Sequence, residues 1–408
     1  MLHLRSLSVV LFLSLLLLPT ATYAQDDVET RFREGIRLVD AGEYDKGWEV
    51  FEELRKSHPH LSAIRYEQAY IRMAQERYRD AIKILEAIVE APDRTAQYFQ
   101  QLGNCYDYID EKEKAIETYY RGLRIFPEAG ELYVDLGVAL ALGDRYDEAV
   151  EIWEKGLTVD PEFPSNYLHT ANYFLQTNAP GWGHIYGEIF LNLEPHSQRS
   201  AVMRRELWKS MVATFSPDHD QVFSVTVDGV KPSRDGDEND SAMNMALQLQ
   251  YMLQTVAQFP LFPDTDTLTD EVTGERSLGF PAYVKNAALT PMLSTGIEEG
   301  DLTIRKLHDY RNSFLESWYA DTVAAGFYNV SLYAYQRALQ QEGLLEAYDY
   351  HLFSTPATET EYRAWAADHA EDLQRLETWL TSHPYDEYDD NPFSRTTMKR
   401  ITLVGDKE

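Results

Sequence analysis

The chain has 408 residues and a formal net charge of −30, from 37 Lys and Arg residues against 67 Asp and Glu residues. Proteins bind nucleic acids mainly through Lys and Arg side chains that displace counterions from phosphates, so this charge argues against DNA or RNA as a partner. The single cysteine, Cys105, excludes an internal disulfide, and we expect it to be a buried small side chain rather than a reactive thiol.

Residues 1–24 have the pattern of a secretory signal peptide. Arg5 precedes an apolar run from Leu7 to Leu18, and the small residue Ala24 ends the segment. A bilayer-spanning helix needs about 20 apolar residues, which is longer than this run. Gln25 follows Ala24 in place of the cysteine that a lipid-anchored bacterial protein would carry. The sequence therefore predicts an exported protein, periplasmic or extracellular, soluble and without a lipid anchor.

Helical segments with a constant spacing of 34 residues follow the signal segment. Small residues recur on the first helix of each unit and on the second, a larger side chain follows four residues after the second small residue, and proline ends the unit. In the order of these four positions, the residues are Gly35, Ala69, Gly103, Gly137 and Ala171; Gly47, Ala81, Ala115 and Ala149; Phe51, Leu85, Tyr119 and Trp153; and Pro59, Pro127, Pro161 and Pro195, with Pro92 one position early.

This pattern resembles the tetratricopeptide repeat family over about residues 28–196. The third and fourth units match best, and the fifth departs through Gly183 and Gly187 in its second helix. The resemblance implies an α-solenoid of about five helix pairs, which we assign to residues 25–196. Fold alone does not specify an activity.

The family's concave groove is lined by the first helix of each repeat, so the resemblance implies a surface for a protein or peptide partner. The groove positions carried over to this chain are Phe32, Tyr66, Tyr70, Met73, Gln97, Gln100, Asn104, Asp107, Glu131, Val134, Val138 and Asn172. The lysines of the family's carboxylate clamp are absent. An alternative is that the aromatic members pack against the next repeat or against the C-terminal domain.

Residues 197–408 lack the repeat, and we expect a mostly helical C-terminal domain with a small β element. The sequence predicts a helix over 198–215, a strand at 223–227, a helix from 241 and a long loop over 259–283. Helices then resume near Leu302 with an apolar face of Leu307, Tyr310, Phe314 and Trp318, and another helix ends near Gly343. A last helix is expected over 359–382, with a core stripe of Tyr362, Trp365, Ala366, His369, Leu373, Leu376 and Leu380.

The chain lacks the sequence signatures of common catalytic and cofactor sites. The acidic run 235–240 resembles a calcium loop but lacks the required glycine and glutamate. A zinc-binding histidine pair, a nucleophile elbow and a phosphate loop are also absent, so we expect no metal and no cofactor. Arg199, Arg204, Arg205 and Lys209 form a basic cluster that pairs with neighbouring acids or receives an anion.

These features favour a non-catalytic scaffold or adaptor of the bacterial cell envelope. Two alternatives stay open. One is an enzyme or small-ligand receptor with its pocket in 197–408, which a deep pocket with converging His308, Arg311 or Asp309 would favour. The other is a spacer whose groove is filled by its own C-terminal helices. The sequence does not give the oligomeric state.

Overall fold

The structure is a computed structural model that describes residues 22–177, 179–215, 267–269, 276–278, 284, 287–288, 291–292, 294–297, 301–328, 330–385, 393–395 and 401–403. The chain is mainly α-helical, as predicted, and divides into two compact units, 1–152 and 153–408. Most of the predicted signal segment, the strand at 223–227, the calcium-like run and the helix from 241 lie outside the described residues. The predicted boundary between 196 and 197 stays a prediction.

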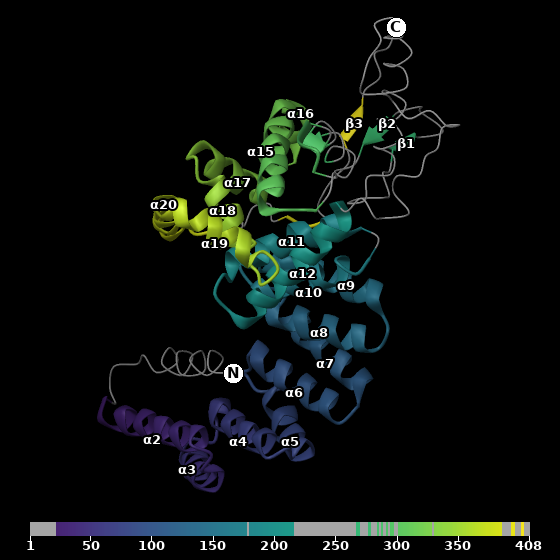
Figure 1. The fold of residues 1–408 in the computed structure, drawn as a ribbon. Helices are drawn as coiled ribbons and strands as arrows, with labels where there is room; N and C mark the ends of the chain where they lie inside the picture. The colour runs from purple at the N-terminus through teal and green to yellow at the C-terminus, as the bar shows by residue number, and fades with distance from the viewer. Residues whose placement is uncertain are drawn as a thin grey trace, which may run out of the picture. The chain divides into compact units, whose positions relative to one another are not determined.

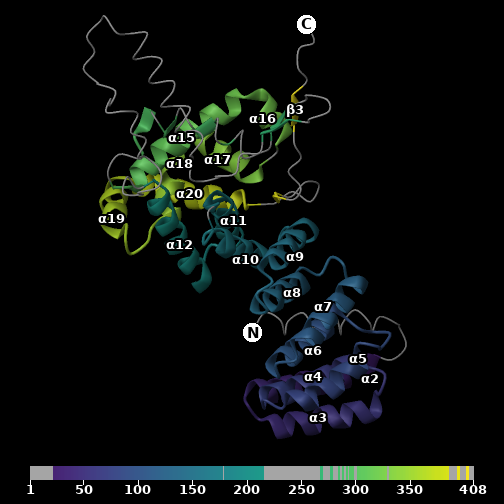
Figure 2. The same ribbon diagram turned by 90° about the vertical axis from the view of Figure 1, so that its right-hand side faces the viewer.

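The helices of the first unit are arranged as successive antiparallel pairs, as Figures 1 and 2 show. The elements are α2 (Thr22–Asp40), α3 (Tyr44–Ser57), α4 (Ser62–Ala74), α5 (Tyr78–Ile88), α6 (Ala96–Tyr108), α7 (Lys112–Ile125), α8 (Gly130–Leu142) and α9 (Tyr146–Val159), the last of which continues into the second unit. From α3 on, the second helices of the pairs begin one repeat length apart. The 34-residue period of the sequence is therefore the period of the helices.

Each turn within a pair is closed in the same way. The left-handed residues Gly42, Glu76, Asp110 and Asp144 lie 34 positions apart, with φ between 58° and 77°. The residue after each one donates its backbone N–H to the carbonyl five positions earlier, as from Glu43 to Leu38 at 2.8 Å. This is a Schellman cap, which satisfies carbonyls that the end of the first helix leaves open.

The small residues of the repeat lie where two helices cross. A Cβ atom added to Gly103 of α6 would lie 2.2 Å from the Tyr119 ring of α7. Tyr119 is fully buried, and so are Phe51 and Leu85 at the same repeat position. The predicted close approach of the two helices is confirmed at these residues.

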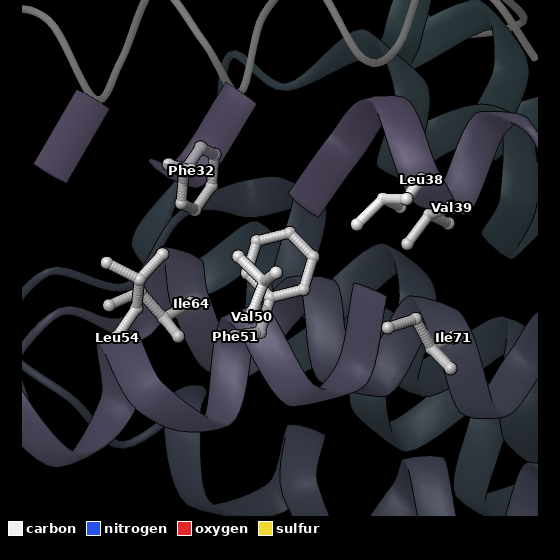
Figure 3. Packing of buried hydrophobic residues seen from close by; sticks show 8 residues of the cluster. All are labelled: Phe32, Leu38, Val39, Val50, Phe51, Leu54, Ile64 and Ile71. Carbon is white, nitrogen blue, oxygen red and sulfur yellow. The ribbon is translucent and has the colours of Figure 1, made fainter. Parts of the chain in front are cut away.

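The first repeats enclose a core formed by α2, α3 and α4, shown in Figure 3. Phe51 has no exposed surface and meets the Phe32 ring edge to face, with the ring centroids 5.4 Å apart. The remaining members of this core are Leu38, Val39, Val50, Leu54, Ile64 and Ile71. Cys105 is also fully buried, and burial raises the pKa of its thiol to about 12, as expected of a packing residue.

The second unit continues with one more helix pair and then loses the repeat. Its helices are α10 (Pro164–Phe174), α11 (Pro180–Leu193), α12 (Gln198–Phe215), α15 (Ile304–Ala320), α16 (Thr322–Phe327), α17 (Ser331–Gln341), α18 (Leu345–Leu352), α19 (Glu359–Asp368) and α20 (Ala370–Ser382). The predicted helix over 198–215 is confirmed. Leu307, Tyr310, Phe314 and Trp318 of α15 are all buried, as their spacing predicted.

The fifth repeat keeps its second helix, α11, although this helix contains three glycines, Gly181, Gly183 and Gly187. A Cβ atom on Gly187 would lie 2.8 Å from the Leu207 side chain of α12. Glycine in a helix interior lowers helix stability by about 1 kcal/mol relative to alanine. Here Gly187 permits α11 to lie close to α12. All residues from Gly181 to Leu191 are buried, so packing maintains this helix.

Three short strands form an antiparallel sheet in the order β1-β2-β3, with β1 (Thr267–Thr269), β2 (Arg276–Leu278) and β3 (Ile401–Leu403). The register pairs Leu268 with Ser277 and Ser277 with Thr402. The sequence predicted a long loop over 259–283, and the structure has two short strands, β1 and β2, within this range. Threonine favours extended backbone in β1, but β1 and β2 have only three residues each and the third strand, β3, lies far away in the sequence, so a local pattern does not reveal the sheet.

The predicted helix over 359–382 is interrupted at His369, where φ is −124° and ψ is 32°. The His369 ring stacks on Trp365 with centroids 4.4 Å apart, and its Nδ1 lies 2.8 Å from the Trp365 carbonyl oxygen. The ring nitrogen thus competes for a carbonyl that a continuous helix would use. Of the predicted core stripe only Leu376 is fully buried, and the other members are half-buried.

A short C-terminal segment is fixed to α9 and α11 within the second unit. The Arg395 backbone N–H donates to the Tyr186 hydroxyl at 2.7 Å, and Arg395 Nη2 pairs with Glu154 at 2.9 Å. Phe393 is fully buried against Tyr186, with ring centroids 5.5 Å apart.

No helix in the described part of the chain is long and apolar enough to cross a membrane.

Candidate functional site

The predicted groove residues fall into two groups in the structure. Phe32, Tyr66 and Gln100 have 1%, 6% and 8% of their surface exposed. The half-buried members are Tyr70, Met73, Gln97, Asn104, Asp107, Glu131, Val134, Val138 and Asn172. Asn172 lies in the second unit and the others in the first.

The two buried aromatic residues belong to the packing between helices. Phe32 contacts Phe51 in the first core, and the Tyr66 ring stacks on Tyr98 of α6 with centroids 5.3 Å apart. A partner can contact only side chains that reach the surface. We therefore leave Phe32 and Tyr66 out of the surface proposed below: Tyr66 packs against the next repeat, whereas Phe32 contacts the second helix of its own repeat.

A polar network joins α6, α7 and α8 around the half-buried members. The Tyr119 hydroxyl lies 2.7 Å from Asn104 Oδ1 and 2.9 Å from Asp107 Oδ2, so it donates its proton to either acceptor. Gln100 Nε2 donates to Asp135 Oδ2 at 2.8 Å. The network holds two amides and two carboxylates in fixed positions.

Asp135 is a member of this network that the sequence reasoning missed. It occupies the sixth place of its repeat, next to the predicted groove residue Val134. The available signal was its charge, because α8 is otherwise apolar over the stretch Leu132–Leu142. Asp135 meets Gln100 of the preceding repeat, a contact between residues 35 positions apart in the sequence.

The α6 and α8 side of the network is acidic, while Lys112 of α7 lies near Asp107 and offsets part of the rise in the pKa of that carboxyl. Neither α6 nor α8 contains a Lys or Arg residue, while Asp107, Glu131 and Asp135 contribute carboxylates. Burial raises the pKa of Asp107, and it raises the pKa of Asp135 to about 6, with a further contribution from the Asp107 charge. This surface therefore favours hydrogen-bond donors and cations.

We expect the Asp135→Asn substitution to change how stability depends on pH. The folded pKa of Asp135 lies above its unfolded value of about 4, so the stabilising contribution is fully present below about pH 4 and is lost as the pH rises through 6. The asparagine variant should lack this part of the decline. Urea unfolding at a series of pH values between about 4 and 7 measures it, and parallel curves for the two proteins would contradict the assignment.

The second unit contains a buried ionic cluster centred on Arg311 of α15. Arg311 Nη1 pairs with Asp349 Oδ1 of α18 at 2.6 Å, and Nη2 pairs with Glu188 Oε1 of α11 at 2.6 Å. His308 Nδ1 lies 2.9 Å from Asp349 Oδ2, and Gln336 Nε2 donates to Glu188 Oε2 at 2.8 Å. The cluster joins four helices of one unit.

Of the three residues whose convergence would favour a pocket, two meet. Arg311 and His308 both contact Asp349, whereas Asp309 is exposed on the same helix, 3.8 Å from Arg305. In the basic cluster, Arg199 Nε pairs with Glu194 at 2.6 Å and Arg204 Nη2 donates to the Pro195 carbonyl at 2.9 Å. The described residues contain no group of three or more His, Cys, Asp or Glu side chains suited to a metal ion.

Comparison with known proteins supports the repeat. Residues 32–98 and 96–128 each match the family described as Tetratricopeptide repeat, so the chain contains tetratricopeptide repeats. Repeats of this family typically serve as protein-interaction surfaces. The human Superkiller complex protein 3 is 27% identical over 101 residues, which are 24% of this chain and 6% of that protein. The chain thus spans a small fraction of that relative.

Three solved structures with the same kind of helical repeat each cover less than half of the chain. MamA is 22% identical, covers 40% of this chain and 94% of its own, and has a TM-score of 0.35. TTC0263 of Thermus thermophilus is 17% identical, with coverages of 45% and 98% and a TM-score of 0.37. Pseudomonas aeruginosa pilF is 15% identical, with coverages of 46% and 85% and a TM-score of 0.40. Nothing about function follows from similarities of this size.

Proposed function

We propose that the chain is a non-catalytic scaffold that binds a protein or peptide partner along the first helices of its repeats. The proposed surface, called the first-helix face below, consists of Tyr70, Met73, Gln97, Asn104, Asp107, Glu131, Val134, Asp135 and Val138. These side chains are half-buried, so they combine a fixed position with accessible surface. The tetratricopeptide repeats of residues 32–128 support a role in protein interaction.

The observation that carries the proposal is the polar network of Asn104, Asp107, Asp135, Gln100 and Tyr119. Its hydrogen bonds of 2.7–2.9 Å restrain the amide and carboxylate side chains before binding. Binding of a partner then costs less free energy for the ordering of side chains than binding to an acidic surface with mobile side chains would. An extended peptide could donate backbone N–H groups to these acceptors and place apolar side chains against Met73, Val134 and Val138.

The charge of the face indicates the chemistry of the partner. Three carboxylates and no Lys or Arg residues on α6 and α8 favour a segment that carries Lys or Arg side chains or a free amino terminus. The net charge of −30 would accelerate association with such a segment at low ionic strength. Affinity should therefore fall as salt is added.

We place this activity in the bacterial cell envelope, after export of the chain. The support for this location is the signal-like sequence of residues 1–24, with its apolar run and Ala24 site. An animal secreted protein of this size would usually contain several disulfides, so the single cysteine favours a bacterial envelope over an animal extracellular location.

Site-specific photocrosslinking tests the face. A photoreactive phenylalanine derivative is introduced at Val138, which is half-buried on α8, and in a second protein at Glu117, which is exposed on α7. We expect irradiation of cells to attach the same partner reproducibly at Val138, because this position borders the network. The attached protein is then identified by mass spectrometry.

The position at Glu117 is the matched control, since it lies in the same unit on a second helix of a repeat. Adducts that are the same at both positions would show non-specific collisions and would refute the first-helix face. Loss of the Val138 adduct in an Asp107→Asn background would support the role of the carboxylates.

A further inference from the structure

A cavity of about 90 Å³ lies in the second unit among α11, α12, α15 and α17. Four of the side chains that line it are aromatic: Phe215, Tyr310, Phe314 and Tyr333. Their rings are mutually packed, with centroids 5.3 Å apart for Phe215 and Tyr310, 6.2 Å for Tyr310 and Phe314, and 5.2 Å for Phe314 and Tyr333. The rings thus form a continuous aromatic wall rather than scattered contacts.

The ionic cluster of Arg311 forms the polar part of the lining. Arg311 and Glu188 line the cavity. Asp349 forms an ion pair with the other terminal nitrogen of the Arg311 guanidinium. Two carboxylates therefore share one arginine, and their side chains are 5% and 0% exposed. His184 also lines the cavity, and burial lowers the pKa of its ring to about 3, so it contributes no positive charge.

The pKa of Glu188 reflects this excess of buried negative charge. This pKa is raised to about 7, mainly by burial and also by the nearby Asp349 charge, and Arg311 and Gln336 offset only part of this increase. The groups that face Glu188 are Arg311, Asp349, Gln336, Tyr333 and Tyr348. A second cation beside Glu188 would compensate the buried carboxylate.

Two of the rings in the wall carry phenol hydroxyls. Tyr310 and Tyr333 are 8% and 7% exposed, and both line the cavity. Burial raises the pKa of each phenol well above its usual range, so both rings stay uncharged. An uncharged phenol ring keeps the electron-rich face that attracts a cation.

We propose that this cavity binds a small organic cation, a methylated ammonium group being the best fit. The aromatic wall supplies the negative faces that attract a diffuse positive charge, and Glu188 supplies the counter-ion. A bare metal ion is a poor fit because the wall offers rings in place of oxygen ligands. Inorganic anions are disfavoured because Arg311 is already paired with two carboxylates, those of Glu188 and Asp349.

The size of the cavity agrees with this ligand class. An apolar protein cavity of about 150 Å³ accommodates benzene, which has six heavy atoms. By proportion, a cavity of 90 Å³ accommodates about four heavy atoms, the number in a trimethylammonium group. Apolar side chains such as Ile185, Met211, Leu307 and Leu332 complete the lining and suit the methyl groups.

Calorimetric titration of the full chain with choline chloride tests the proposal, because the four heavy atoms of its trimethylammonium group match the cavity and its hydroxyethyl arm can extend through the side of the cavity that is open to solvent. The comparison ligand is the neutral isostere of choline in which carbon replaces the quaternary nitrogen, because it has the same shape without the charge. We expect choline to bind at least about ten-fold more tightly than the isostere at about pH 8. Affinity should weaken as the pH falls through 7, because protonation of Glu188 removes the counter-ion.

Three variants locate the site. Glu188→Gln should abolish the preference for choline over the isostere, and Glu316→Gln, which removes an exposed carboxylate from α15, should leave it unchanged. Tyr333→Leu removes one ring from the wall and keeps an apolar side chain, so it should reduce the preference even if Glu188→Gln does not fold. Equal affinities of the natural chain for choline and the isostere, or no binding of either ligand, would overturn the proposal.

Discussion

Replacement of Arg311 by methionine should destabilise the second unit by about 3–5 kcal/mol. Arg311 is 8% exposed in its side chain and forms ion pairs of 2.6 Å with Glu188 and Asp349. Methionine approximates its length and removes its charge, so two carboxylates would remain buried without their shared cation. A buried unpaired charge is among the most destabilising changes in a folded protein.

Urea unfolding combined with hydrogen exchange of peptides from 153–408 measures this loss. The control is Arg305→Met on the same helix, where the side chain is 55% exposed and pairs with Glu346; we expect a change of less than about 1 kcal/mol. Adding Glu188→Gln to Arg311→Met should recover part of the loss. Equal effects of the two arginine substitutions would show that the cluster contributes no more than a surface ion pair.

Truncation of Phe51 to alanine should destabilise the first unit by about 3–5 kcal/mol. The side chain has no exposed surface and occupies the space between α2 and α3, where it lies against Gly35 and Phe32. Its removal would leave a cavity among the residues shown in Figure 3, because Gly35 has no side chain that could fill the space.

Chemical denaturation followed by hydrogen exchange over 28–90 reports this change. Leu142→Ala is a suitable control, since Leu142 is 64% exposed at the end of α8, and its effect should stay within about 0.5 kcal/mol. A loss for Phe51→Ala as small as that of the control would mean that the helix pairs do not depend on the aromatic position of the repeat.

The repeat could be predicted from the sequence because its determinants are local. Gly103, Ala115 and Tyr119 lie within one unit, and the space that Gly103 leaves is the space that the Tyr119 ring occupies. The same physical requirement recurs every 34 residues, so errors at one unit are corrected by the others. Figure 1 shows the resulting succession of helix pairs.

The second unit could be predicted only element by element. The apolar face of α15 was visible because Leu307, Phe314 and Trp318 repeat at helical spacing. The contact between Arg311 and Glu188 joins residues 123 positions apart, and no local pattern contains it. The helix is interrupted at His369, whose ring stacks on Trp365. The spacing of apolar residues does not reveal this contact and therefore predicted one continuous helix.

The candidate face was predicted in part. Asn104 and Asp107 occupy family groove positions and lie in the polar network, whereas Phe32 occupies such a position and is buried. Phe32, Tyr66 and Gln100 occupy the same position of the first three repeats and all three are buried, so this position faces the packing between helices there. Asp135 was missed because its partner Gln100 lies in the neighbouring repeat.

We infer that the first-helix face binds a partner through its acidic network. The most direct measurement is a fluorescence titration of the partner captured at Val138 against the natural chain, Asp107→Asn and Glu117→Gln, at low and high salt. We expect Asp107→Asn to weaken binding by about ten-fold at low salt and Glu117→Gln to have no effect. Equal affinities for all three proteins, with no dependence on salt, would contradict the account.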